Sequence, residues 1–180
     1  VACKRGNHFK AQTKQTKINL IYVIKGNTLE RFSDDPRFVA EKAEIFMKNQ
    51  DIADTCLLGP EFEFFVLDHV SYKNTNQHME VKLDSAQANW NSSDDSYKNI
   101  GFTVPHHGGY HLDSPFDASY EFRTEVALEA EKINIPIKYH QSENGGPGQV
   151  EIEVNFSGIK DMGDRTMKLK NLLNLTAFKH

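Results

Sequence analysis

The stretch Gly59-Pro60-Glu61-Phe62-Glu63-Phe64-Phe65 alternates acidic and aromatic residues. Successive side chains of a β-strand point to opposite faces, so Glu61 and Glu63 are expected on one face and Phe62 and Phe64 on the other. Two carboxylates on one face repel each other, and nothing within the segment neutralises them. Hard divalent cations such as Mg²⁺ and Mn²⁺ prefer carboxylate oxygens and would remove this conflict. The stretch therefore predicts a half-buried strand with a metal-binding face.

A second acidic stretch follows about ninety residues later. It reads Glu143-Asn144-Gly145-Gly146-Pro147-Gly148-Gln149-Val150-Glu151 and continues as Ile152-Glu153-Val154. Its glycine-rich run would let the backbone turn sharply, with Pro147 limiting its freedom. The end of the stretch alternates as the first one does, which predicts another strand with Glu151 and Glu153 on one face.

Bulk properties limit the class of protein. A chain of 180 residues can bury one substantial core, and its net charge of −4 argues against a nucleic-acid partner. No apolar run approaches the roughly 18–20 residues of a membrane helix, and no signal-peptide pattern opens the sequence. The two cysteines, Cys3 and Cys56, form no CxxC motif. We expect a cytoplasmic protein without a membrane partner.

The local patterns predict a series of helices and strands. Asp35 followed by Pro36 is typical of an N-cap and the first helical position. Residues 69–113 are polar and are expected to form a functional loop region anchored by Trp90, interrupted by one short strand. The predicted helices cover 36–49, 118–133 and 160–178, and the predicted strands cover 18–24, 61–68, 79–83 and 137–140. This order, with alternating strands, is typical of an α+β domain built on an antiparallel sheet.

The two acidic stretches resemble the catalytic domain of type I glutamine synthetase, in which such segments supply metal-binding glutamates. Four further segments follow the order of that family, at positions 33–37, 52–55, 88–93 and 108–110. The resemblance covers about residues 17–180 and implies a curved antiparallel sheet backed by helices. It also implies that the chain is a fragment, with 1–33 as a basic tail and the remnant of a small N-terminal β domain, and with 34–180 as the first part of the catalytic domain.

The resemblance implies roles for individual residues. Tyr110 matches a tyrosine near the ammonium pocket, Phe156 an aromatic residue that stacks on adenine, and Lys138 a position where many members have a nucleotide-contacting glutamate. Glu153 would at most support the metal ligands from outside. The implied ligands of two Mg²⁺ or Mn²⁺ ions are Glu61, Glu63, Glu143 and Glu151.

The chain departs from the family pattern at three positions. Gln141 stands in the usual His-His-Glu run, Lys138 reverses a charge, and Asn155 replaces a common arginine. These departures bear on nucleotide binding more than on metal binding. His106, His107 and His111 could suggest a zinc site, but no cysteine accompanies them and their spacing matches no strong zinc pattern, so polar loop histidines are the better interpretation.

The implied activity is ATP-dependent ligation of ammonia to glutamate through γ-glutamyl phosphate, giving glutamine. The implied partners are glutamate, ammonium and ATP, in a dodecamer of two rings. The 180-residue chain alone is expected to be inactive, because the family's remaining substrate and metal residues lie beyond His180. Two alternatives stay open: a γ-glutamyl ligase for amines or polyamines, and a non-enzymatic scaffold, which would lose the four glutamates that this chain retains.

Overall fold

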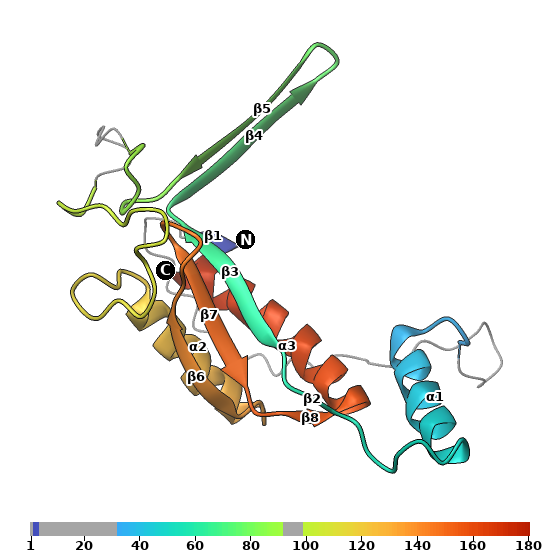
Figure 1. Ribbon diagram of the computed structural model, residues 1–180. Coiled ribbons are helices and arrows are strands. Elements are labelled where there is room, and N and C mark those ends of the chain that lie inside the picture. The colour runs from blue at the N-terminus through green and yellow to red at the C-terminus, as the bar shows by residue number, and fades with distance from the viewer. Residues whose placement is uncertain (1, 4–31, 92–98) are drawn as a thin grey trace. The chain divides into compact units, whose positions relative to one another are not determined.

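The computed structural model describes residues 2–3, 32–91 and 99–180, and it divides into two compact units (Figure 1). The first unit is built mainly from residues 60–155 and 169–180, and the second from the described part of 9–59 with 156–168. Helix α3 (Ile159–Lys179) contributes residues to both. The strand predicted over 18–24 lies outside the described residues, and the domain boundary predicted after residue 33 stays a prediction.

The first unit contains a four-stranded sheet in the order β1-β3-β7-β6. Strand β7 (Gln149–Val154) runs antiparallel to β3 (Glu61–Leu67) on one side and to β6 (Ile137–Ser142) on the other. The short β1 (Ala2–Cys3) pairs with β3 in parallel. The α+β class with an antiparallel sheet backed by helices is confirmed, as are the strands predicted from both acidic stretches.

One face of this sheet forms the core with two helices. Helix α2 (Tyr120–Lys132) and the part of α3 that belongs to this unit, from residue 169 onward, lie behind the strands in Figure 1. The rings of Phe64 on β3 and Phe122 on α2 meet edge to face, with their centroids 6.4 Å apart. Full burial of each such apolar side chain contributes about 1.5–3 kcal/mol. The buried apolar residues of these elements are Val66, Leu67, Phe122, Val126, Ala130, Val150, Ile152, Val154, Leu169, Leu173 and Ala177. The predicted apolar face of α2 is therefore confirmed.

A buried ionic group joins α2 to β6. Arg123 is only 1% exposed, and its guanidinium pairs with both carboxylate oxygens of Asp117. Its Nε also donates to Nδ1 of His140, at 3.3 Å. Buried charges of this kind are tolerated only when they are paired and hydrogen-bonded. This network fixes the position of α2 against the strand that leads into the glycine-rich loop.

A long hairpin replaces the first part of the predicted loop region. Strands β4 (His69–Thr75) and β5 (His78–Asp84) pair antiparallel over their whole length, and the hairpin projects from the sheet in Figure 1. The side chain of Thr75 closes the two-residue turn by accepting from the backbone N–H of His78, at 3.1 Å. The prediction of a loop over 69–78 was therefore wrong. Trp90 was also wrongly predicted as an anchor, since it is 54% exposed.

The second unit contains α1 (Pro36–Asn49) and the paired strands β2 (Leu57–Leu58) and β8 (Ser157–Gly158). Asp35 caps α1 as predicted, with its carboxylate accepting from the backbone N–H of Arg37 at 3.1 Å. The Nε of Arg37 also donates to Asp164 in the first turns of α3, at 2.9 Å. None of the described helices is long and apolar enough to cross a membrane.

Candidate metal centre

The face of the sheet opposite the core presents a row of carboxylates. Glu61 on β3 lies directly opposite Glu153 on β7, and Glu63 lies opposite Glu151. The intervening residues pair in the same way, with Phe62 opposite Ile152, and point to the helices. Because side chains alternate along both strands, a single register places all four glutamates on one face.

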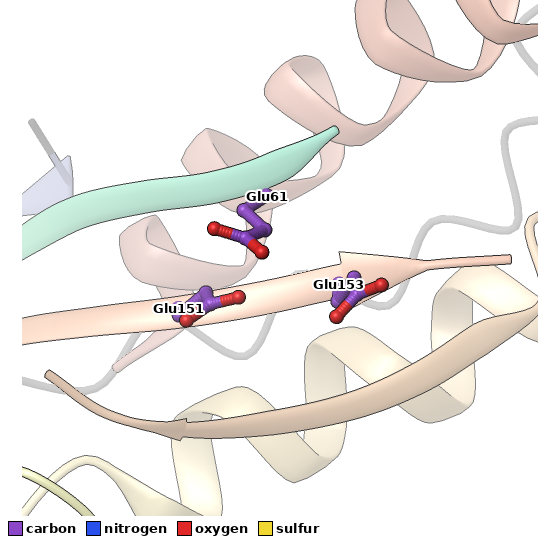
Figure 2. Close-up of side chains that lie close together, drawn as sticks. All are labelled: Glu61, Glu151 and Glu153. Carbon is purple, nitrogen blue, oxygen red and sulfur yellow. The ribbon is translucent and has the colours of Figure 1, made fainter. Parts of the chain in front are cut away.

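Three of these carboxylates converge. One oxygen from each of Glu61, Glu151 and Glu153 lies within 4.8 Å of the other two, and Figure 2 shows Glu61 next to β3, with Glu151 and Glu153 on the neighbouring β7. Glu61 is exposed, whereas Glu151 and Glu153 retain only 4% and 8% of their accessible surface. Like charges this close, and partly removed from water, favour the uptake of a cation or a proton.

Glu143 joins the same face through an amide. The Nε2 of Gln141 donates to Oε1 of Glu143 at 2.8 Å and to Oε2 of Glu151 at 2.9 Å. Burial and the adjacent Glu143 carboxyl raise the pKa of Glu151 to about 7. Although burial acts to raise it, the backbone N–H of Asn144, the Glu151 carboxyl and Gln141 together hold the pKa of Glu143 below its ordinary value. Glu151 is thus the carboxyl of this pair that retains a proton most readily when no cation is bound.

One carboxylate oxygen is left without a partner. Oε1 of Glu151 is buried and makes no hydrogen bond to any protein atom. A buried acceptor left unsatisfied costs about 1–3 kcal/mol, and more when it is charged. The oxygen belongs to the residue whose carboxylate meets Glu61 and Glu153 (Figure 2). The residues therefore fit a hard divalent cation, with oxygen donors and one donor that lacks any other partner.

Gln149, the first residue of β7, holds the side chain of Glu63 in place. Its Oε2 accepts from Nε2 of Gln149 at 2.9 Å, and the Oε1 of Gln149 accepts from the backbone N–H of Gly145. Gly148 has a φ of +82°, and a Cβ at this position would lie 2.4 Å from the carbonyl oxygen of Val66. The sharp glycine-rich turn is confirmed, and it anchors the loop between Glu143 and Glu151 against β3.

The structure places the expected residues in different surroundings. Glu61 and Glu151 belong to the converging group, Glu143 is linked to it through Gln141, and Glu63 lies across from Glu151 without joining the group. Glu153, to which the sequence assigned only a supporting place, is the third member. Its alternation with Glu151 was the available signal, but membership depends on the pairing of β3 with β7.

The three remaining candidates lie outside the carboxylate group. Lys138 forms an ion pair with Glu153, with its Nζ 2.7 Å from Oε1. Tyr110 is 58% exposed and its ring lies edge-on to His111, at 4.2 Å between centroids. Phe156 belongs to the second unit and is 67% exposed. Their roles toward ammonium and nucleotide stay predictions.

Comparison with known proteins identifies the family. The family model described as "Glutamine synthetase, catalytic domain" matches residues 33–180, which include both acidic strands. The chain belongs to the glutamine synthetase family. A glutamine synthetase of Aquifex aeolicus (strain VF5) is 31% identical over 153 residues, covering 85% of this chain and 32% of that protein. A glutamine synthetase of Azotobacter vinelandii is 34% identical over 156 residues, covering 86% of this chain and 33% of that protein.

The chain thus spans about a third of the length of these glutamine synthetases. Another relative, the 3-hydroxylaminophenol mutase of Cupriavidus pinatubonensis (strain JMP 134 / LMG 1197), is 33% identical over 156 residues, covering 86% of this chain and 33% of that protein. The fold matches the cryo-EM structure of Plasmodium falciparum glutamine synthetase with a TM-score of 0.75 at 22% identity, covering 85% of this chain and 30% of that chain. The glutamine synthetase fold is therefore shown, whereas the name of the mutase means that family membership alone does not fix the reaction.

Proposed function

We propose that this chain carries the divalent-metal centre of an ATP-dependent glutamate–ammonia ligase. The observation that carries the proposal is the buried, unpartnered Oε1 of Glu151 within a group of carboxylates from two strands. Glu61, Glu63, Glu143 and Glu151 are the proposed ligands of Mg²⁺ or Mn²⁺, and Glu153 adjoins them. When bound, the metal would neutralise charge on the phosphate oxygens during phosphoryl transfer.

The residues around the carboxylates support this role by holding them in place. Gln141 donates to Glu143 and Glu151 at once, which fixes both carboxylates from one side. Gln149 orients Glu63 and ties it to the glycine-rich loop. Ligands that are already oriented lose less conformational freedom when an ion binds, so such contacts raise metal affinity, typically by about 10- to 100-fold.

The substrate contacts form the finer part of the proposal and rest on the family resemblance. Glutamate would attack the γ-phosphate of ATP through its γ-carboxylate, breaking the bond to ADP, and ammonia would then displace phosphate to give glutamine. Tyr110 and Phe156 are exposed enough to meet ammonium and adenine, respectively. Lys138 is placed for a nucleotide contact only if its ammonium leaves Glu153. The proposed setting is a cytoplasmic dodecamer of two rings.

A second candidate is a relative that handles a different nitrogen substrate, such as a γ-glutamyl ligase for amines or polyamines. The observation that supports considering it is the 33% identity to a protein named 3-hydroxylaminophenol mutase, a name that differs from that of a glutamate–ammonia ligase. Such an enzyme would retain the metal carboxylates and differ in the nitrogen pocket.

Direct metal binding tests the proposal. Titration of the chain with MnCl₂ in a calorimeter is expected to show binding that Glu151→Gln weakens by at least about tenfold, because a direct ligand is lost. Glu129→Gln is the matched control, since Glu129 is a partly exposed acid paired with Lys132 at 2.7 Å on α2. Equal binding by Glu151→Gln and the wild type would overturn the metal centre. ATP-dependent phosphate release by the full-length protein, with ammonium compared with putrescine, then separates the two candidate reactions.

A further inference from the structure

Glu153 differs from its two neighbours because it already has a cationic partner. The Nζ of Lys138 lies 2.7 Å from its Oε1. The Lys138 ammonium, and after it the neighbouring Tyr139 hydroxyl, keep the pKa of Glu153 below its ordinary value. Glu151, in contrast, has a buried oxygen, Oε1, without a hydrogen-bond partner. The three carboxylates that converge in Figure 2 are therefore unequal, with one neutralised by the protein itself.

A β-bulge brings the side chain of Lys138 to Glu153. On β6, Ile137 pairs with Val154 and Tyr139 pairs with the adjacent Glu153, so Lys138 is an extra residue in the ladder. A bulge of this kind redirects a side chain that regular alternation would point to the other face. As a result, Lys138 reaches the carboxylate of Glu153 while the next residue, Tyr139, lies directly opposite Glu153 in the ladder. The backbone pairing of β6 with β7 therefore positions Lys138 to contact Glu153.

We propose that Lys138 sets the affinity of the carboxylate group for divalent cations, by holding Glu153 in an ion pair with which a bound cation must compete. This inference rests on the proposed metal centre and assigns to Lys138 the part of an internal counter-ion. When all three converging carboxyls, Glu61, Glu151 and Glu153, are ionised, as they would be around a bound cation, their charge is −3, and the Lys138 ammonium paired with Glu153 reduces it to −2. The Lys138 side chain is 53% exposed and can move away from Glu153, so it tunes binding without blocking it.

The expected effect follows from the charges. Replacing Lys138 with methionine keeps most of the aliphatic stem and removes the competing ammonium, so Glu153 becomes available to the ion. An extra unit of negative charge a few ångströms from a partly buried cation strengthens binding, by about tenfold as an order of magnitude. Removing the carboxylate while the lysine remains has the opposite effect, because the ammonium is then left facing the site.

Titrating four proteins with MnCl₂ in a calorimeter tests the proposal. They are the wild type and three variants: Lys138→Met, Glu153→Gln and the double variant. Lys138→Met should bind Mn²⁺ about tenfold more tightly than the wild type, and Glu153→Gln more weakly. The double variant should lie within about threefold of the wild type, since the ion pair is removed as a neutral unit. Mn²⁺ electron paramagnetic resonance gives an independent readout, with a changed zero-field splitting expected in Lys138→Met.

The matched control is Lys82→Met, which removes a similar lysine paired with Glu80 at 3.1 Å on the β4–β5 hairpin. It should leave Mn²⁺ affinity within about twofold of the wild type, which excludes a simple effect of net charge. Binding that Glu151→Gln abolishes but Lys138→Met leaves unchanged or weakens would overturn the role of Lys138 alone. Absence of Mn²⁺ binding in every variant would overturn the proposed metal centre, and this inference with it.

Discussion

Glu61 on β3 lies directly opposite Glu153 on β7, so two like charges occupy a cross-strand pair. Opposed like charges destabilise a sheet, typically by a few tenths of a kcal/mol to about 1 kcal/mol. The chain repeats the arrangement one pair further along, where Glu63 faces Glu151. Lys138 and Gln149 relieve part of this repulsion through Glu153 and Glu63. Glu151 retains an oxygen without a hydrogen-bond partner, so contact with this residue would stabilise a bound cation most.

Glu151→Gln is expected to separate the stability of the metal-free chain from its response to metal. Glutamine retains an oxygen for the Gln141 contact and removes a carboxyl that is buried with one oxygen unpartnered. Without metal, the variant should be as stable as the wild type or more stable by up to about 1 kcal/mol. Saturating Mn²⁺ should raise the melting temperature of the wild type more than that of the variant, since a ligand at 100 times its Kd adds about 2.7 kcal/mol and a ligand bound more weakly adds less. Thermal unfolding with and without Mn²⁺ measures both effects, and equal stabilisation of the two proteins by Mn²⁺ would contradict the prediction.

The acidic face could be predicted from the sequence because it depends on one local property. Alternation with period two places Glu61 with Glu63, and Glu151 with Glu153, whichever strands pair. The convergence of Glu61, Glu151 and Glu153 depends instead on the register between strands about ninety residues apart. The bridging amide of Gln141 requires the same long-range pairing. No local pattern contains that information.

The bulge and the hairpin were missed for a different reason. A bulge at Lys138 leaves no mark in composition, because the extra residue is ordinary in type. Strand β4 is polar at every second position, and its turn lacks the Asn-Gly or Asp-Gly pair typical of tight hairpins. The turn is instead closed by the side chain of Thr75. The hairpin also exposes Tyr72 and Met79, so burial does not explain its apolar residues.

Gly148→Ala should damage the loop between Glu143 and Glu151 more than Gly101→Ala damages its own loop. Both glycines have nearly the same positive φ, +82° and +84°. An added Cβ at position 148 would lie 2.4 Å from the carbonyl oxygen of Val66, whereas nothing lies within 4 Å at position 101. The backbone strain alone costs about 1–2 kcal/mol in each case, and the clash adds to it only at position 148.

Urea unfolding measures this difference in stability between the two alanine variants. Mn²⁺ titration adds a second readout, since only the Gly148 variant should also bind the ion more weakly. Equal losses of stability in the two variants would show that the close approach to Val66 is relieved at little cost.

Arg123→Met should be among the most destabilising single changes in the first unit. It leaves the carboxylate of Asp117 without its guanidinium partner, and that side chain is 4% exposed. Breaking a buried pair from one side typically costs about 3–5 kcal/mol. Adding Asp117→Asn should restore most of the loss, because the uncompensated charge is removed while an oxygen is retained for the backbone N–H of Ser119. Urea unfolding of both variants measures this recovery, and a double variant no more stable than Arg123→Met would contradict the explanation by charge.

His140 is expected to make the stability of the first unit depend on pH. Burial, and then the positive charge of Arg123, lower the pKa of His140 below its ordinary value of 6.5, while Asp117 opposes the shift. The unfolded chain therefore binds a proton at this histidine more readily than the folded chain does. The contribution of His140 to stability is fully present above pH 6.5 and is lost as the pH falls from 6.5 through the lowered pKa. Protonation also removes the Nδ1 acceptor that Arg123 uses.

The matched variant is His140→Asn, which retains an acceptor and does not titrate. The free energy of unfolding, measured by urea from about one pH unit above 6.5 to about two below it, should fall more steeply for the wild type than for the variant. The difference between the two curves isolates His140 from the other seven of the eight histidines in the chain. Parallel curves would mean that His140 titrates alike in the folded and unfolded chain, and that its contact with Arg123 contributes nothing that depends on its protonation.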